Sequence, residues 1–147
     1  MNKPDEGMPD LIDAKEPDYL YLETSALLGA GMGLYTAIKI YRNERISLFK
    51  GVILSAREAA IRVKNNADGY FINMPDGTIM DSREVSCFAK YANDAEGYKK
   101  SGAKNNSIIA LDQQDKVCLI ATRDIKSGEE IFCGYGKEYW KKFLNKN

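Results

Sequence analysis

Short runs of apolar and β-branched residues recur along this chain, and one segment has the clearest features of a helix. In that segment Ser55 and Glu58 form a capping box, and Ala59, Ala60 and Val63 supply an apolar stripe. Many short strands with little helix predict a mainly β domain with short helices and long connections. The runs with strand character lie within residues 19–25, 33–40, 45–54, 68–81, 107–122 and 129–136.

Length and charge restrict the classes of protein to which the chain can belong. Its 147 residues fit one domain with a core of its own. Lys and Arg together number 21, as do Asp and Glu, whereas proteins that bind nucleic acid through phosphates are usually basic. No stretch approaches the roughly 20 apolar residues of a membrane span. The acidic N-terminus does not have the pattern of a signal peptide. We therefore expect no direct nucleic-acid or membrane partner.

The chain contains three cysteines and no histidine. The cysteines are far apart, so they predict neither a disulfide framework nor a zinc site, and we expect no resident metal. A soluble protein of a reducing, intracellular compartment is the corresponding expectation. The absence of histidine also excludes a Ser–His or Cys–His nucleophile pair. Any acid–base chemistry must then depend on Tyr, Lys, Asp or Glu.

The domain organisation follows from a change of pattern near residue 19. Prolines interrupt residues 1–18, which contain several acidic residues and few apolar ones. This composition predicts a mobile acidic arm. The regular strand pattern begins at Tyr19, and we expect the folded domain to span residues 19–147.

Three short motifs are ambiguous when each is taken alone. Residues 29–35, G-A-G-M-G-L-Y, start like a dinucleotide-binding loop, but Leu34 stands at the third glycine position and no helix follows. A glycine-rich bend is the simpler interpretation. Residues 89–95, A-K-Y-A-N-D-A, fit a turn, because Asn and Asp hydrogen-bond their own backbone. Tyr135 lies between two glycines, where it is either a core aromatic or a ring that a ligand must approach.

The order of these motifs resembles that of the SET domain, the fold of protein-lysine methyltransferases. Residues 121–136, A-T-R-D-I-K-S-G-E-E-I-F-C-G-Y-G, match the closing motif of that family, in which A-x-R-D-I-x-x-G-E-E leads into a strand ending in tyrosine and glycine. Residues 31–35 match the opening motif, Gly-x-Gly followed by an apolar and an aromatic residue. Residues 90–95, K-Y-A-N-D-A, keep the asparagine of the middle motif but not the histidine and serine after it, which is similar to PR-type members. The resemblance covers about residues 18–143.

The resemblance implies both a fold and an activity. The fold would consist of small curved sheets with a C-terminal pseudoknot, and it would lack zinc because the cysteine-rich segments that flank many SET domains are missing. The activity would be transfer of a methyl group from S-adenosylmethionine to a lysine side chain of a protein or peptide. In the family, cofactor and peptide bind on opposite faces and meet through a narrow channel.

The same resemblance implies roles for particular residues. Tyr135 would be catalytic, with its ring in the channel wall and its hydroxyl toward the methyl group and the amine. Asn93 would hold the methionine part of the cofactor, and the backbone at Asn93 and Asp94 would meet the adenine edge. The backbone of the opening motif would form another side of that pocket, and Trp140 would cover the adenine. The implied cofactor-binding residues are Gly31, Met32, Gly33, Leu34, Asn93, Asp94 and Trp140.

The substrate side departs from the family pattern at two positions. The usual Glu-Tyr-x-Gly appears as L-F-K-G at residues 48–51, so Phe49 lacks a hydroxyl that could hydrogen-bond the target amine. In the family, phenylalanine in the lysine channel accompanies higher methylation states. Ile109 stands where many members place another channel aromatic, which would widen the channel. The implied substrate-binding residues are Phe49, Ile109 and Tyr135.

Alternatives to an active enzyme remain open from the sequence. PR-type domains include members that bind partners and transfer little or no methyl, so a SET-fold interaction module without turnover is the main rival. The presence of both Tyr135 and Asn93 favours an enzyme. A β-rich nucleic-acid binder is a third interpretation, and it would need a basic face. Trp140 has an alternative role as a core anchor for a short C-terminal helix at residues 137–144.

Overall fold

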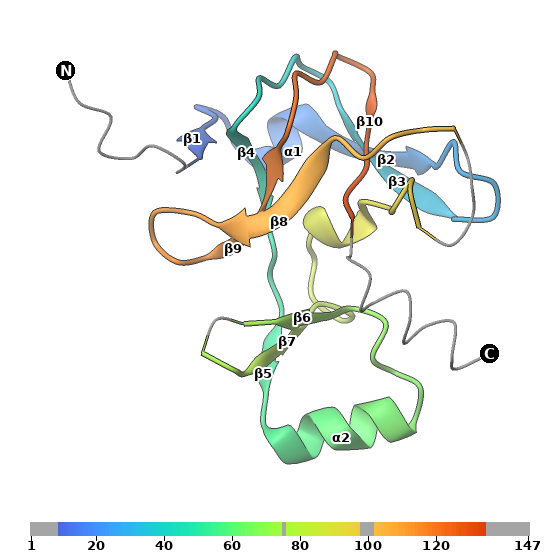
Figure 1. Cartoon of the computed structure of the whole chain (residues 1–147), viewed down its shortest axis with the longest axis vertical. Helices are drawn as coiled ribbons and strands as arrows, with labels where there is room; N and C mark the ends of the chain where they lie inside the picture. Colours follow the sequence, from blue (N-terminus) through green and yellow to red (C-terminus); the bar gives the residue numbers. More distant parts are fainter. Residues whose placement is uncertain (1–8, 75, 98–101, 135–147) are drawn as a thin grey trace.

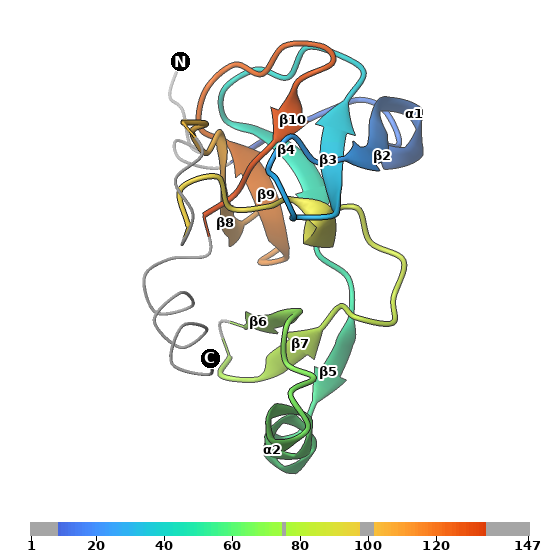
Figure 2. The ribbon, with the colours of Figure 1, turned by 90° about the vertical axis from the view of Figure 1, so that its right-hand side faces the viewer.

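The computed structural model describes residues 9–74, 76–97 and 102–134. Within this part of the chain, short strands form three small sheets, and helices are few and brief. Two of the sheets lie together at one end of the molecule, and the third lies at the other end with the longest helix (Figures 1 and 2). The expectation of a mainly β domain with short helices is confirmed.

The largest sheet has four strands in the order β1-β4-β9-β8. Strand β9 is buried along its whole length and pairs antiparallel with both β4 and β8. The strand character predicted within residues 107–122 is therefore confirmed, and the two strands there form a hairpin with a polar tip between β8 and β9. The strands are β1 (Asp10–Leu11), β4 (Glu44–Leu48), β8 (Ser107–Leu111) and β9 (Val117–Ala121).

A second sheet joins segments that are about a hundred residues apart in the sequence. Its order is β10-β3-β2, so β3 lies in the centre and pairs antiparallel with both neighbours. Strand β10 pairs only with the last part of β3, through Glu130 with Tyr35 and Ile131 with Leu34. The strands are β2 (Leu20–Thr24), β3 (Met32–Thr36) and β10 (Glu130–Ile131).

The third sheet, in the order β5-β7-β6, packs with helix α2 (Ala56–Lys64). The predicted capping box is confirmed, because Ser55 Oγ accepts from Glu58 N and the Glu58 carboxylate accepts from Ser55 N. The predicted apolar stripe is buried only at Ala59, whereas Ala60 is exposed. The strands are β5 (Val52–Leu54), β6 (Phe71–Asn73) and β7 (Ile79–Asp81).

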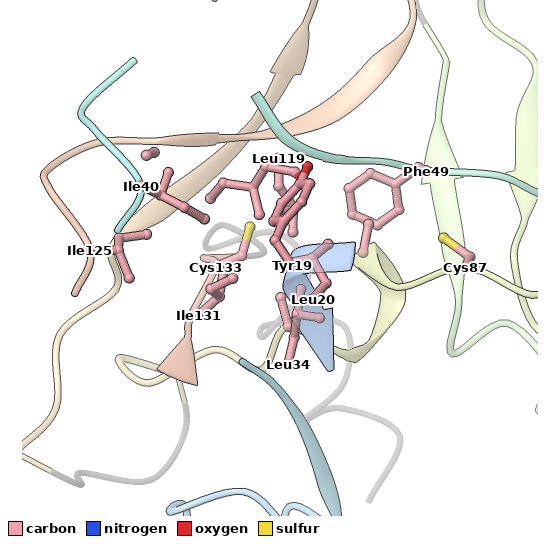
Figure 3. Close-up of a cluster of buried hydrophobic side chains, with 14 of the residues drawn as sticks. Tyr19, Leu20, Leu34, Ile40, Phe49, Cys87, Leu119, Ile125, Ile131 and Cys133 are labelled. Atoms are coloured by element: carbon pink, nitrogen blue, oxygen red, sulfur yellow. The ribbon is translucent and has the colours of Figure 1, made fainter. Parts of the chain in front are cut away.

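The main hydrophobic core lies between the first two sheets (Figure 3). Leu34 of β3, Ile131 of β10 and Leu119 of β9 are each fully buried in it. Tyr19 is also buried there, and its hydroxyl donates to Ile46 O at 2.7 Å, so the one polar atom of its side chain is satisfied.

Residues 9–18 differ from the sequence-based expectation of a mobile arm. Strand β1 pairs parallel with β4, and helix α1 (Glu16–Tyr19) follows after residues 12–15. The Glu16 carboxylate accepts from Ser47 Oγ at 2.6 Å and from Leu48 N at 3.0 Å. Composition could not reveal this packing, because the segment has few apolar residues and is held largely by hydrogen bonds to a strand some thirty residues away, with Ile12 packed against the core.

Candidate active site

The three motifs of the sequence meet at Asn93. Its side-chain Nδ2 donates to Met32 O of the opening motif at 3.1 Å. Its own backbone O accepts from Cys133 N of the closing motif at 2.9 Å, and Asn93 forms a parallel bridge with Phe132. One residue of the middle motif therefore links two segments that lie 61 residues before it and some 40 residues after it.

This meeting point is open on the side of the opening motif. Strand β10 ends opposite Leu34, so the backbone of Met32 and Gly33 extends beyond the end of β10. Met32 is 45% exposed, and a Cβ added at Gly31 would meet no atom within 4 Å. Gly31 also has φ +76, a conformation that favours glycine. Leu34, in contrast, places its side chain in the core and pairs with both neighbouring strands.

The need for glycine at position 33 is explained by the neighbouring carboxylate of Glu130. A Cβ at this position would collide with the carboxylate of Glu130 and would lie 3.2 Å from Ser25 Cα. Glu130 is only 5% exposed, although it is charged and lies in the short strand β10. The absence of a side chain at residue 33 therefore makes room for a buried acid beside the opening motif.

Asp94 directs its carboxylate to the protein rather than away from it. Its Oδ1 accepts from Glu96 N at 3.0 Å and from Asn105 Nδ2 at 2.9 Å. Asn105 in turn accepts from Ala95 N at 2.8 Å through its Oδ1. A Cβ at Gly134 would lie 3.1 Å from Asn105 Nδ2. These contacts hold the middle motif against the segment that directly precedes Tyr135.

Asn106 is a site-supporting residue that the sequence interpretation missed. It is fully buried, its Nδ2 donates to Glu130 O at 2.9 Å, and its Oδ1 accepts from Phe132 N at 2.8 Å. Its backbone N also donates to Phe132 O at 3.0 Å. The side chain thus occupies the place of a neighbouring strand along residues 130–132. The surrounding sequence K-N-N-S is typical of a polar loop. The one available signal was that no glycine or proline, which would favour a turn, stands next to Asn106.

Lys90 fixes the short helix that carries the middle motif, η1 (Ala89–Tyr91). Its ammonium group donates to the backbone O atoms of Ser82, Arg83 and Val85, at 3.1, 3.2 and 2.9 Å. A cation that satisfies three carbonyl groups ties the loop after β7 to η1, two residues before Asn93.

The thiol of Cys133 is unreactive, although it lies beside the candidate site. It is 1% exposed, and burial raises the pKa of its thiol to about 12. The reactive form of cysteine is the thiolate, so this thiol is protonated at neutral pH. We therefore assign it a packing role rather than a nucleophilic one.

The expected substrate-side residues belong to the core region. Phe49 is 7% exposed and lies in the core cluster with Tyr19 and Cys87 (Figure 3). Ile109 of β8 is partly buried and packs against the same cluster. Tyr135 and Trp140 lie outside the described residues, as does the segment expected as a C-terminal helix, so their assignments remain predictions.

A separate pocket of about 270 Å³ lies on the N-terminal side of the molecule. Its lining includes Lys15, Glu16, Tyr19 and Lys50. Only Lys50, next to Phe49, adjoins a residue expected at the site, and the Glu16 carboxylate is already engaged by Ser47 and Leu48. We do not assign this pocket to the cofactor, because the three motifs contribute nothing to it.

A comparison with protein-family models places these motifs in a known family. The model of the SET domain matches residues 31–136, which begin at the opening motif and end just after Tyr135. The match covers more than half of the chain, and the chain therefore belongs to the SET domain family, whose members are generally protein-lysine methyltransferases. A search among curated proteins returned no match.

Two further observations concern other kinds of site. Among the described residues, no helix combines the length and the apolar character that crossing a bilayer requires. Within the same residues, no group of three or more Cys, Asp or Glu side chains is arranged to hold a metal ion.

Proposed function

We propose that this protein is an S-adenosylmethionine-dependent methyltransferase that acts on a lysine side chain of a protein or peptide. The observation that carries the proposal is the position of Asn93, which bonds to the opening motif at Met32 and to the closing motif at Cys133. Convergence of these segments is what a site built from all three motifs requires. Membership of the SET domain family supports the reaction class.

The residues at this point suit S-adenosylmethionine. The cofactor carries a carboxylate and an amine at its methionine end and a sulfonium at its centre. Asn93 offers an amide beside the opening motif, Met32 is half-exposed next to it, and Gly31 leaves open space beside them. We assign Gly31, Met32, Gly33, Asn93 and Asp94 to cofactor binding, with Leu34 contributing through its backbone and Trp140 covering the adenine.

The cofactor would supply the methyl group, and the protein would have to supply a neutral amine. A lysine ammonium has a pKa of about 10.4 in water, so holding it neutral at pH 7 costs about 4 kcal/mol without help from the site. An apolar channel lowers this cost, because desolvation disfavours the charged form. We assign this task to Phe49, Ile109 and the ring of Tyr135. The Tyr135 hydroxyl would orient the amine, which is an orientation effect that needs neither histidine nor metal.

Thermal unfolding with S-adenosylmethionine tests the proposal, with Asn93→Ala as the diagnostic variant. Specific binding to the native protein raises the unfolding midpoint in a concentration-dependent way. We expect Asn93→Ala to weaken cofactor binding by about tenfold, or about 1.4 kcal/mol, because it removes a hydrogen-bonding amide from the site. Asn73→Ala is the matched control, since Asn73 is exposed in β6 at the other end of the molecule. Absence of any shift with the unaltered protein at millimolar cofactor would contradict the proposal, and equal affinity in Asn93→Ala would remove Asn93 from the site.

Replacing Tyr135 with phenylalanine tests the catalytic assignment. We expect turnover to fall by about tenfold or more while cofactor affinity and the unfolding midpoint stay near their original values, because only a hydroxyl that orients the reacting groups is lost. Methyl transfer from labelled cofactor to a mixed protein extract provides the measurement. The corresponding Tyr41→Phe change, at an exposed tyrosine, should leave turnover unaltered. Unchanged turnover in Tyr135→Phe would show that the hydroxyl is not used.

A SET-fold interaction module is the second candidate function. It is favoured by the altered middle motif, in which Asp94 replaces the family histidine and directs its carboxylate to Asn105 and Glu96 N. Such a module would fold as described and retain partner binding without methyl transfer. The cofactor titration separates the two, because the module would show a weak midpoint shift or none.

A further inference from the structure

The carboxylate of Glu130 binds the loop that leads into the opening motif. Ser25 Oγ donates to Glu130 Oε2 at 2.6 Å, and Ala26 N donates to Oε1 at 2.9 Å. The Tyr35 hydroxyl lies 3.2 Å from Oε1 and shares its proton between this oxygen and Thr24 O. The acid is buried, and the space for it exists because residue 33 is a glycine. Burial of a charge is costly unless donors satisfy it, and here Ser25 Oγ and Ala26 N donate fully while the Tyr35 O–H is shared.

The loop of residues 25–31 has little else to hold it in place. Leu28 at its tip is 93% exposed, so the hydrophobic effect does not fix the tip. Within the loop, Ser25 N donates to Gly31 O at 2.7 Å and Leu27 N donates to Ser25 Oγ at 3.1 Å. Ser25 therefore hydrogen-bonds within the loop, to Leu27 and Gly31, and to the Glu130 carboxylate of β10.

The Tyr35 phenol lies beside the Glu130 carboxylate. Desolvation and the nearby Glu130 carboxylate both raise the pKa of the Tyr35 phenol above its usual value. The phenol therefore keeps its proton at neutral pH. Its single O–H is shared between Thr24 O at 2.7 Å, at the strand end from which the loop departs, and Glu130 Oε1 at 3.2 Å.

We propose that Glu130 is a positioning residue for cofactor binding: its carboxylate holds the loop 25–31, and through Ser25 and Gly31 it sets the backbone conformation at Met32 and Gly33 that receives S-adenosylmethionine. This inference rests on the proposed function for the identity of the ligand. Glu130 does not reach the open surface at Gly31 and Met32, since its carboxylate lies on the Ser25 side of Gly33. Its effect on the cofactor would be exerted through the loop.

The test combines cofactor affinity with amide hydrogen exchange in the full chain. We expect Glu130→Ala to weaken S-adenosylmethionine binding by about tenfold or more and to speed exchange of the Ala26 and Leu27 amides, because both lose the anchor of their loop. Ser25→Ala removes one donor to Glu130 and also the acceptor of Leu27 N, so its diagnostic readouts are cofactor affinity and exchange of the Ala26 amide. Both should change in the same direction as in Glu130→Ala but by less, and this variant replaces Glu130→Ala if the latter folds poorly. Glu130→Gln keeps the size of the side chain and one acceptor oxygen for Ala26 N, and should recover most of the affinity.

Glu23→Ala is the matched control for charge. Glu23 is exposed on β2 and lies opposite Gly33, so its removal takes a negative charge from the same region without touching the loop anchor. We expect its cofactor affinity to stay within about twofold of the original. Original affinity in folded Glu130→Ala and Ser25→Ala proteins would overturn the inference, as would unchanged exchange at Ala26. If the unaltered protein failed to bind the cofactor, both the proposed function and the cofactor part of this inference would be wrong. The exchange rates would still show whether Glu130 holds the loop.

Discussion

Replacing Asn106 with alanine is expected to lower the free energy of unfolding by about 3 kcal/mol. The side chain is fully buried, and it both donates to Glu130 O and accepts from Phe132 N. Alanine would leave the Phe132 N–H without this acceptor in the interior, and an unsatisfied buried donor costs more than the hydrogen bond itself contributes. Urea unfolding followed by circular dichroism measures the change.

The control for this prediction is Asn73→Ala, the same chemical change at an exposed strand position. Surface changes of this kind usually stay within about 0.5 kcal/mol. Asn106→Asp adds a second comparison, because it keeps the acceptor for Phe132 N and loses the donor to Glu130 O. A loss no larger in Asn106→Ala than in Asn73→Ala would show that the buried amide does not support the closing motif.

Replacing Arg62 with alanine is expected to cost about 3 kcal/mol, because it leaves a buried carboxylate without its partner. The guanidinium of Arg62 in α2 donates to Asp81 Oδ2 at 2.6 Å, and the Asp81 side chain is only 1% exposed. Asp81 would keep a single neutral donor, Arg83 N at 3.0 Å. Alanine is itself the best helix former, so weaker helix propensity cannot account for a loss.

Hydrogen exchange would locate the effect of Arg62→Ala, and Arg57→Ala serves as its control. Arg57 lies in the same helix and is exposed. We expect the amides of β5 and β7 to exchange faster in Arg62→Ala, since Asp81 ends the strand that pairs with both edges of this sheet. Equal stability of the two arginine variants would mean that the pair with Asp81 contributes nothing net.

Local features of this fold were predictable from the sequence because their causes are local. The capping box at Ser55 and Glu58 uses residues three apart, and the hairpin between β8 and β9 joins apolar runs across a short polar tip. The cofactor-side motifs were found through their resemblance to the SET domain, and the family match covers them.

The supporting residues of the candidate site were not predictable because their partners are distant. Nothing around Asn106 in the sequence indicates that its amide takes the place of a strand beside residues 130–132. Glu130 belongs to a recognised motif, but its pairing with Ser25 and with the empty side of Gly33 appears only once β2, β3 and β10 are assembled. The packing of residues 9–18 was missed for the same reason.

The pairing of Ser25 with Glu130, 105 residues further on, has a consequence for how the protein is made. During synthesis the ribosome releases residues 25–33 long before residues 130–133, so β2 and β3 leave the ribosome before β10, which pairs with β3 in the folded protein. The candidate site can form only after the closing motif has been synthesised and has packed beside Gly33 and Asn93. A product that ends before Glu130 would therefore lack this site, however much of the remaining chain had folded.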